Sequence, residues 1–158
     1  MNCIRRRAWM LVILLVCMGM NAVRSPDSVA FVQAQTPQQS AGALMSAEDL
    51  KEKITRNEQV TIIDVRSTSS YVGSDSKIKG AIYIKLRRLN VRLGFPPLKN
   101  VSRDSEVIAY CACPNDESSL RAVQILSAAG FTRARALKGG WRMWLKVNGP
   151  VEPKPRGT

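Results

Sequence analysis

The run Val-Thr-Ile-Ile-Asp-Val at residues 60–65 constrains the fold of this chain more than any other segment. It is almost continuously apolar and rich in β-branched side chains, which is typical of a parallel strand buried on both faces. Shorter apolar runs alternate with helix-like segments along the chain; the runs lie at 81–84, 107–110 and 134–137, and the helical segments at 47–54, 87–93, 118–129 and 141–147. This alternation predicts an α/β fold, an open parallel sheet of about five strands with helices on both faces.

A chain of 158 residues suits one domain with appendages. We expect the folded domain at residues 44–152. The segment before it, at residues 35–43, is rich in Gln, Pro, Ser and Ala and is typical of a flexible linker. The Pro-rich end, at residues 153–158, is expected to be a disordered tail.

Residues 1–34 have the features of an export segment. Three consecutive arginines precede an apolar stretch at residues 9–20, which is short for a helix that spans a bilayer. Candidate cleavage sites lie near Ala34 and near Ala22. Two interpretations stay open, a signal peptide that is removed and an N-terminal anchor formed by residues 9–20. Under both, we expect an exported protein of the periplasm or cell envelope.

The formal net charge is +12, and the chain contains no histidine. The absence of His excludes Cys–His and Ser–His–Asp catalysis and removes the commonest metal ligand. After residue 34, Lys and Arg are scattered, apart from a cluster at residues 85–88. In an exported protein this distribution favours a solvated basic face, or association with an anionic membrane surface, over a nucleic-acid partner.

Cys111 is the candidate nucleophile because of its position in the predicted fold. It follows the strand at residues 107–110 and precedes a polar loop that opens the helix at residues 118–129. The unpaired N–H groups and partial positive charge of a helix N-terminus favour the thiolate, which is the reactive form of cysteine. Asp64 also ends a predicted strand, and open parallel sheets bind ligands at the carboxyl ends of their strands. The alternative is that Cys111 is a buried cysteine without a chemical role.

Five motifs in this order resemble those of a single rhodanese domain, a sulfurtransferase module: Ile-Ile-Asp-Val-Arg at 62–66, Ile-Lys-Gly-Ala-Ile at 78–82, Val-Ile-Ala-Tyr-Cys at 107–111, Ala-Ala-Gly-Phe at 128–131 and Leu-Lys-Gly-Gly-Trp at 137–141. The resemblance covers about residues 44–152. Directly before the second motif, Lys77 stands in place of the usual His, and within the motif Lys79 stands in place of the usual Pro. The resemblance implies the rhodanese-like fold, with Cys111 as the sulfur-carrying residue.

The loop after Cys111 departs from the common family pattern, Cys-x-x-Gly-x-Arg-Ser. It is about two residues longer and is similar to a less common Cys-x-Cys-Pro variety of the family. Counting back from Gly130 aligns Ser119 with the family's Ser and places Ser118 where its Arg is expected. The resemblance therefore implies an active-site loop whose backbone N–H groups surround the sulfur, formed by Ala112, Cys113, Pro114, Asn115, Asp116, Glu117, Ser118 and Ser119.

Asp116 and Glu117 bring negative charge to this loop. We expect them either to repel thiosulfate and oppose thiolate formation or to complement the dipole of the following helix. Glu117 also stands where a related phosphatase needs an Arg, which argues against that activity. Asp64 and Arg66 are expected to support the site, Asp64 as an acceptor for loop N–H groups and Arg66 as a partner for a carboxylate or carbonyl.

Three interpretations of Cys113 stay open. It is a resolving thiol that attacks a persulfide or sulfenate on Cys111, a ligand that holds a soft metal such as Cu(I) together with Cys111, or a small loop residue without chemical consequence.

The resemblance implies a sulfurtransferase that carries sulfur as a persulfide on Cys111, and the export segment at residues 1–34 makes it an exported one. Its partners would be a small sulfur donor, thiosulfate or another persulfide donor, and a thiol or cyanide acceptor, with no metal and no cofactor. Two alternatives stay open: a catalytically silent rhodanese-like module that binds a partner, and a thiol-redox or soft-metal protein that uses Cys111 and Cys113.

The predicted linker makes the export segment dispensable for folding. A chain that begins at Ala41 is expected to be soluble and to unfold in a single cooperative transition, measured by circular dichroism in increasing urea. Aggregation of the shortened chain, or a gradual loss of signal, would contradict the predicted boundary.

Overall fold

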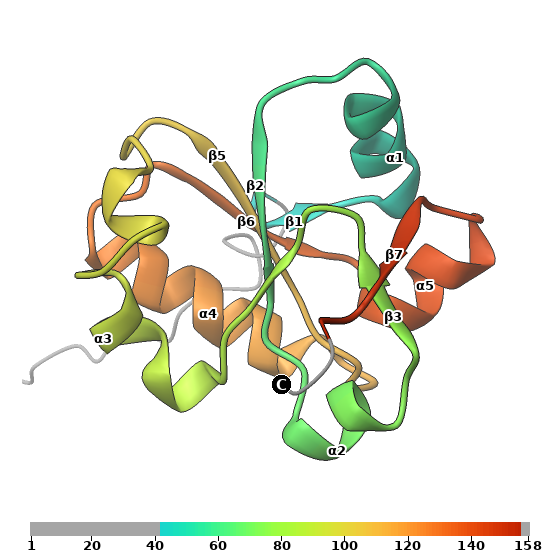
Figure 1. Ribbon diagram of the computed structural model, residues 1–158. Helices are drawn as coiled ribbons and strands as arrows, with labels where there is room; N and C mark the ends of the chain where they lie inside the picture. Colours follow the sequence, from blue (N-terminus) through green and yellow to red (C-terminus); the bar gives the residue numbers. More distant parts are fainter. Residues whose placement is uncertain (1–41, 156–158) are drawn as a thin grey trace, which may run out of the picture. The chain divides into compact units, whose positions relative to one another are not determined.

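Strands β2 (Val60–Asp64) and β5 (Glu106–Tyr110) form the centre of the sheet in the computed structural model, which describes residues 42–155 (Figure 1). β4 (Ile82–Tyr83) pairs with β2, while β6 (Arg133–Leu137) and β1 (Leu44–Met45) continue the sheet beyond β5. The strand order is β1-β6-β5-β2-β4, and every pair is parallel. The predicted α/β fold with a five-stranded parallel sheet is confirmed. The predicted export segment and most of the linker lie outside the described residues.

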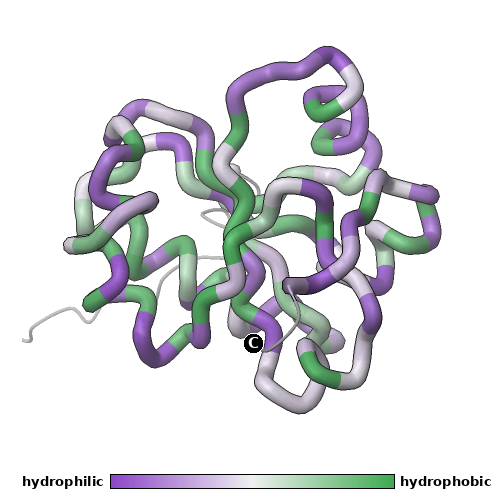
Figure 2. Tube along the Cα trace, viewed as in Figure 1, coloured by the Kyte–Doolittle hydropathy of each residue, from purple (hydrophilic) through white to green (hydrophobic). Residues whose placement is uncertain are grey.

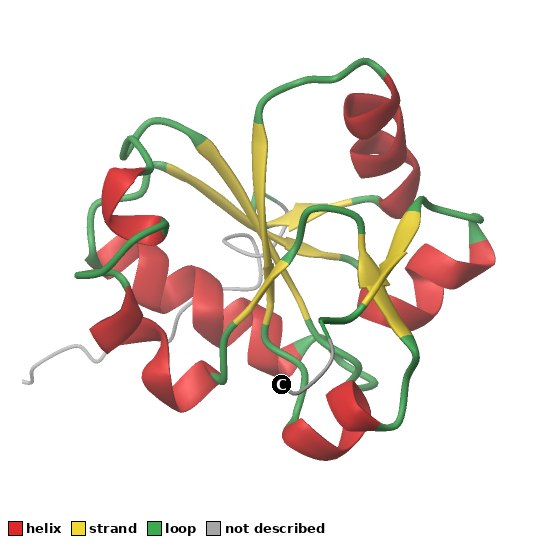
Figure 3. Cartoon of the chain, viewed as in Figure 1, coloured by secondary structure: helices red, strands yellow, loops and turns green. Residues whose placement is uncertain are grey.

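Helices cover both faces of this sheet (Figure 3). α1 (Ala47–Thr55) and α5 (Gly140–Lys146) pack on one face, and α3 (Leu89–Arg92) and α4 (Glu117–Ala128) pack on the other. Three short helices lie in the connections: α2 (Thr68–Val72) and the 3-10 helices η2 (Leu86–Arg88) and η3 (Leu98–Asn100). Between residues 42 and 155, no helix has the length and apolar character needed to cross a membrane.

The central strands are buried on both faces, as the apolar run at residues 60–65 predicts. Ile63 points into the core beneath α3 and α4, whereas Ile62 and Ile108 point into the core beneath α1 and α5. Figure 2 shows apolar residues gathered along these strands. Complete burial of one such side chain contributes about 1.5–3 kcal/mol to folding, so the two clusters together hold the sheet between its helices.

Local signals in the sequence set the ends of the longer helices. The side chain of Ser46 caps α1 by accepting a hydrogen bond of 3.0 Å from the backbone N–H of Asp49. Helix α4 ends at Ala128, and Gly130 follows with φ +91°, a conformation that residues with a side chain rarely adopt. The observed bounds of both helices differ from the predicted ones by one residue at each shifted end.

A second, two-stranded sheet is absent from the sequence prediction. β3 (Ser76–Ile78) and β7 (Val151–Pro153) pair in antiparallel orientation. Between them Lys77, only 7% exposed, forms an ion pair with Glu152 and donates a hydrogen bond of 2.6 Å to the carbonyl of Ala81. Strands of three residues carry too few side chains for a periodic pattern, which is why the sequence does not reveal them.

Part of the predicted tail is therefore in contact with the domain. Pro153 ends β7, and the ammonium group of Lys154 donates to the carbonyl of Tyr71 and lies 4.8 Å from the centre of its ring. The remainder of the predicted tail, residues 156–158, lies outside the described residues.

Candidate active site

The carboxyl ends of three neighbouring strands meet at one edge of the sheet. Asp64 is in register with Tyr83 of β4 on one side and with Tyr110 of β5 on the other. Cys111 follows Tyr110 directly and begins the loop to α4. Asp64 and Cys111 thus lie at the same edge, where the sequence places them and where open parallel sheets bind their ligands. Figure 1 shows the strands β2 and β5 that lead to this edge.

The Cys111 side chain is buried, with 1% of the residue exposed. It packs in the core beneath α3 and α4, and its Sγ lies 3.6 Å from the hydroxyl of Ser119. That hydroxyl donates to the carbonyl of Asp116 over 2.8 Å. Ser119, in the first turn of α4, thus contacts the candidate nucleophile.

Cys113 and Cys111 are joined by a disulfide, and their Cα atoms lie 5.8 Å apart. The backbone N–H of Ser118, in the first turn of α4, points to Sγ of Cys113 at 3.5 Å. The sequence predicts that backbone N–H groups of the loop surround the sulfur of Cys111. In this disulfide-bonded state, the described hydrogen bond from the first turn of α4 to a cysteine sulfur goes to Cys113 instead. Since Cys113 is only half-buried, solvent reaches the pair through this residue.

Asp116 ties the loop to the turn between β6 and α5. Its backbone adopts the left-handed conformation, with φ 56°, and its side chain makes no capping bond to α4. Oδ2 instead accepts a hydrogen bond of 2.7 Å from the backbone N–H of Gly139, while Oδ1 is buried without a partner in the described part of the chain. Glu117, in contrast, is exposed in the first turn of α4 and can complement its dipole. The two acids therefore have different roles, which the sequence does not separate.

Gly140 allows the same turn to approach the backbone of Cys111. A Cβ atom at this position would overlap the carbonyl oxygen of Cys111, and its φ of +49° also disfavours other residues. The N–H of the next residue, Trp141, donates a hydrogen bond of 2.8 Å to that carbonyl. The Gly-Gly pair before Trp141 is the sequence signal for this contact, although it predicts only a turn.

Asp64 and Arg66 form a buried ion pair beside the loop. The guanidinium of Arg66 donates to both oxygens of Asp64 at 2.7–3.0 Å, and the N–H of Arg66 also donates to Oδ1. Arg66 further donates to the hydroxyl of Ser74 and the carbonyl of Ser76. The described donors to Asp64 are Arg66 and the hydroxyl of Tyr110, and Arg66 has no exposed side-chain surface from which to bind a sulfur donor.

Tyr110 completes this network and was missed by the sequence prediction. Its hydroxyl donates to Oδ2 of Asp64 over 2.7 Å and accepts from the N–H of Ile78. Burial raises the pKa of Tyr110 above its ordinary value, and the negative charge of Asp64 acts in the same direction. The phenol therefore stays protonated and remains a donor at neutral pH. A tyrosine directly before Cys111 is the signal that could have indicated this role.

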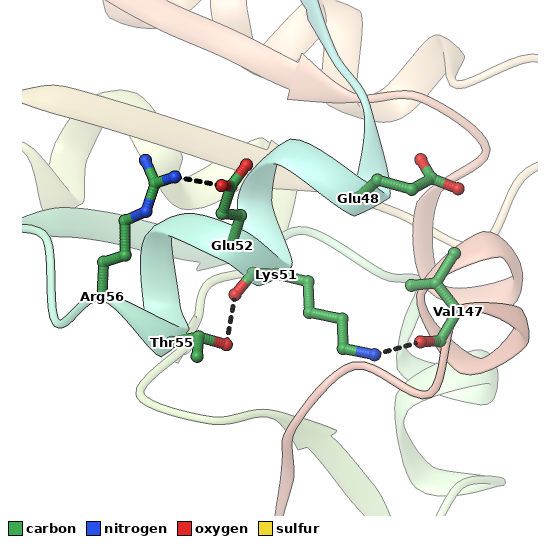
Figure 4. Close-up of a pocket in the computed structure, with 6 residues that line it drawn as sticks. All are labelled: Glu48, Lys51, Glu52, Thr55, Arg56 and Val147. Carbon is green, nitrogen blue, oxygen red and sulfur yellow. Dashed lines mark hydrogen bonds and ion pairs between the residues drawn. The ribbon is translucent and has the colours of Figure 1, made fainter.

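Two pockets in the described part of the chain are lined by residues other than Cys111. The pocket in Figure 4 has a volume of about 500 Å³ and lies between α1 and the end of α5, where Lys51 donates to the carbonyl of Val147 over 2.8 Å. A second pocket, of about 390 Å³, lies at the end of β4 and is lined by basic residues. In residues 42–155, no group of three or more Cys, Asp or Glu side chains is placed to hold a metal ion.

Replacing Arg66 by Met should reduce the free energy of unfolding by about 3–5 kcal/mol, because Asp64 would be left as a buried charge without its partner. Chemical denaturation of both proteins measures the difference. The matched control is Arg56→Met, since Arg56 pairs with Glu52 on the surface and its loss should cost less than about 1 kcal/mol. Equal losses in the two variants would contradict the structural role of Arg66.

Gly140→Ala should destabilise the protein more than Gly80→Ala. Both glycines have positive φ, so either alanine is strained by about 1–2 kcal/mol, but only the alanine at 140 collides with Cys111. After reduction, the Gly140 variant should also show an altered rate of alkylation of Cys111 by iodoacetamide, followed by mass spectrometry. A control variant that is as destabilised as Gly140→Ala would contradict this contact.

Comparison with known proteins is consistent with this geometry. The family model for a rhodanese-like domain matches residues 46–147. The solved structure of the Alr3790 protein from Anabaena sp. is 32% identical, with a TM-score of 0.59, and the match covers 70% of this chain and 82% of that one. For the BH2092 protein from Bacillus halodurans the identity is 27% and the TM-score 0.61, with 73% and 80% covered.

The human single-domain sulfurtransferase TSTD1 shares the fold at 23% identity and a TM-score of 0.56, with 66% of this chain and 96% of that one covered. A search of curated protein sequences gave no match. The family model accounts for most of the described residues, including the strand that leads to Cys111 and the turn that contacts it. The chain therefore belongs to the rhodanese-like family and has a sulfurtransferase-type fold.

Proposed function

We propose that this chain is an exported sulfurtransferase that carries sulfur as a persulfide on Cys111. The observation that supports this most is the position of Cys111, at the carboxyl edge of a rhodanese-like sheet and at the start of the loop to α4. The export part of the proposal depends on the basic and apolar residues at 5–20.

Sulfur loading needs Cys111 as a free thiolate. The thiolate attacks the outer sulfur of thiosulfate, a bond forms between the two sulfurs, and the S–S bond of the donor breaks to release sulfite. An acceptor thiolate then attacks the outer sulfur of the persulfide and leaves with it, which returns Cys111 as a thiolate. Cyanide can take the sulfur in the same way and leave as thiocyanate. None of these steps needs a metal or a cofactor.

Cys113 provides a second route for the loaded sulfur. Its thiol, after losing its proton, attacks Sγ of Cys111, so that the terminal sulfur leaves as hydrosulfide and a disulfide joins the two cysteines. The product of this step would be a disulfide between Cys111 and Cys113, the pairing that the structure contains. Two equivalents of an external thiol would then reduce it, and the half-buried Cys113 is the sulfur that the first of them would reach.

The same disulfide favours a second candidate function, a thiol-redox protein that exchanges disulfides through Cys111 and Cys113. In that case the pair is the functional group itself, and no sulfur atom is carried. The two functions differ in one measurable product, because only the sulfurtransferase gains the mass of one sulfur atom when it is incubated with a donor.

Single cysteine variants separate these functions. The reduced Cys111→Ser protein should lose sulfur loading from thiosulfate completely, because a hydroxyl is a far poorer nucleophile and cannot form a persulfide. Cys113→Ser should still gain one sulfur atom, seen by intact-mass spectrometry, but should release much less hydrosulfide. Cys113→Ser is thus the matched control for the loss of one thiol from the loop.

Three other outcomes would contradict the proposal. Loading in Cys111→Ser but not in Cys113→Ser would assign the nucleophile to Cys113. Complete loss in both variants, with disulfide exchange in the parent protein, would support the thiol-redox function. No loading of the reduced parent protein by any sulfane donor would leave the chain as a silent rhodanese-like module.

A further inference from the structure

One segment of the domain is basic throughout and has no role in the proposed sulfur chemistry. Between residues 78 and 103 the sequence contains no Asp and no Glu. The cations in this segment are Lys79, Lys85, Arg87, Arg88, Arg92, Lys99 and Arg103. The segment includes the strand β4 and the helices η2, α3 and η3. A run of one charge without acids attracts anionic partners.

The folded domain holds the middle of this segment in a fixed orientation. Leu89 and Leu93 are buried in the core beneath α3 and α4. Arg87, Arg88 and Arg92, in contrast, are exposed. Since residues four apart lie on one face of a helix, the two leucines form the inner face of this connection and the arginines form its outer face.

The three exposed arginines line a pocket together with a lysine. A volume of about 390 Å³ is surrounded by Lys85, Arg87, Arg88 and Arg92, with Tyr83 and Ile84. Within residues 42–155, none of the four cations forms an ion pair. Like charges that converge on a concave surface create a positive potential there, which favours binding of an anion.

Tyr83 adds a polar group to the wall of this pocket. Its ring is stacked on Tyr71, with 3.7 Å between the ring centres. Its hydroxyl is buried and has no hydrogen-bond partner in the described part of the chain. Buried tyrosine hydroxyls normally find a partner, and a phosphate oxygen held by the four cations would be an acceptor for this one.

Two large apolar side chains stand in water beside the cations. Val91 is 65% exposed and Phe95 is 54% exposed, and Arg92 lies between them in the sequence. Figure 2 shows hydrophilic and hydrophobic stretches alternating along the connection that contains α3. Transfer of such side chains into an apolar medium is favourable, so a partner with an apolar phase would gain affinity here.

A bilayer with anionic headgroups is the partner that fits both features. Its phosphates complement the arginines, and the boundary between its headgroups and acyl chains takes up exposed apolar side chains. A nucleic acid offers phosphates without an apolar phase. A free anion the size of phosphate would leave Val91 and Phe95 in water.

We propose that a membrane-binding surface, formed by Lys85, Arg87, Arg88, Val91, Arg92 and Phe95, attaches the domain peripherally to an anionic phospholipid membrane, with a headgroup phosphate in the pocket. The inference goes beyond the proposed function, because membrane binding requires no transfer of sulfur. It also gives a location to the membrane association that the sequence leaves open.

Flotation of the full chain with lipid vesicles tests this surface. The vesicles consist of phosphatidylcholine alone or of phosphatidylcholine mixed with phosphatidylglycerol. The chain should partition at least about tenfold more strongly into the anionic vesicles, and the difference should shrink as salt is added, because salt screens exposed charges. Residues 1–34 are the same in every variant, so a difference between variants reports on the domain.

Charge variants locate the surface. Arg87→Gln/Arg88→Gln should weaken partitioning into the anionic vesicles by about thirtyfold, because each basic residue near such a membrane contributes about 1 kcal/mol. The matched control is Arg142→Gln/Lys146→Gln, which removes the same charge from exposed positions on α5, on the other face of the sheet. It should weaken partitioning by less than about threefold, because charges that face away from the membrane are screened.

A second pair of variants tests the apolar contact. Phe95→Ser should weaken partitioning by about tenfold, because its ring no longer leaves water on binding. Leu145→Ser is the matched control, since Leu145 is 48% exposed on α5 and should not touch the membrane. Circular dichroism should show the fold of the parent chain in both variants. Equal partitioning of these two variants would contradict insertion of Phe95.

Three results would overturn the inference. The first is an equal loss in the two charge variants, because net charge alone would then explain binding. The second is equal partitioning of the parent chain into neutral and anionic vesicles. The third is the absence of vesicle binding together with binding of inorganic phosphate or of a DNA duplex that Arg87→Gln/Arg88→Gln abolishes. Cys111→Ser should bind vesicles as the parent chain does, so a failure of sulfur loading and a failure of membrane binding are distinguishable.

Discussion

The buried ion pair between Asp64 and Arg66 is the interaction on which the edge of the sheet depends. Both side chains are shielded from solvent, and their removal from water is expensive unless every polar atom has a partner. The structure provides those partners from several segments: Tyr110 before Cys111, Ser74 and Ser76 before the second motif, and the ring of Trp141, which lies 4.5 Å from the guanidinium carbon. The Asp64–Arg66 pair thus holds β5, the segment at residues 74–76 and α5 in place relative to β2.

The sequence predicts most of this fold because its strands are buried on both faces. The apolar run at 60–65 identifies β2, and the run before Cys111 identifies β5, with the candidate nucleophile at its end. β1, β3 and β7 escape prediction because strands of two or three residues show no periodicity. β4 is as short, but it lies within the apolar run at residues 81–84. Their pairing depends on contacts that are distant in sequence, such as Lys77 with Glu152.

The site, like the fold, depends partly on signals that are local in sequence and partly on contacts between distant segments. Cys111, Asp64 and Arg66 can be placed from motifs that are local in sequence. The roles of Asp116 and Gly140 cannot, because each depends on the approach of the β6–α5 turn to the loop, which only the folded chain creates. The basic residues after β4 are visible in the sequence as a cluster, but their convergence on one pocket depends on the turn from η2 into α3.

The pairing of Cys111 with Cys113 also bears on chemical survival. A lone thiolate that reacts with peroxide forms a sulfenic acid, and further oxidation gives sulfinic and sulfonic acids that thiols cannot reverse. If the pair acts as proposed, the second cysteine, two residues away, would convert the first of these products to a disulfide before the later ones form. The loop would thereby keep its sulfur at an oxidation level from which an ordinary thiol can restore it.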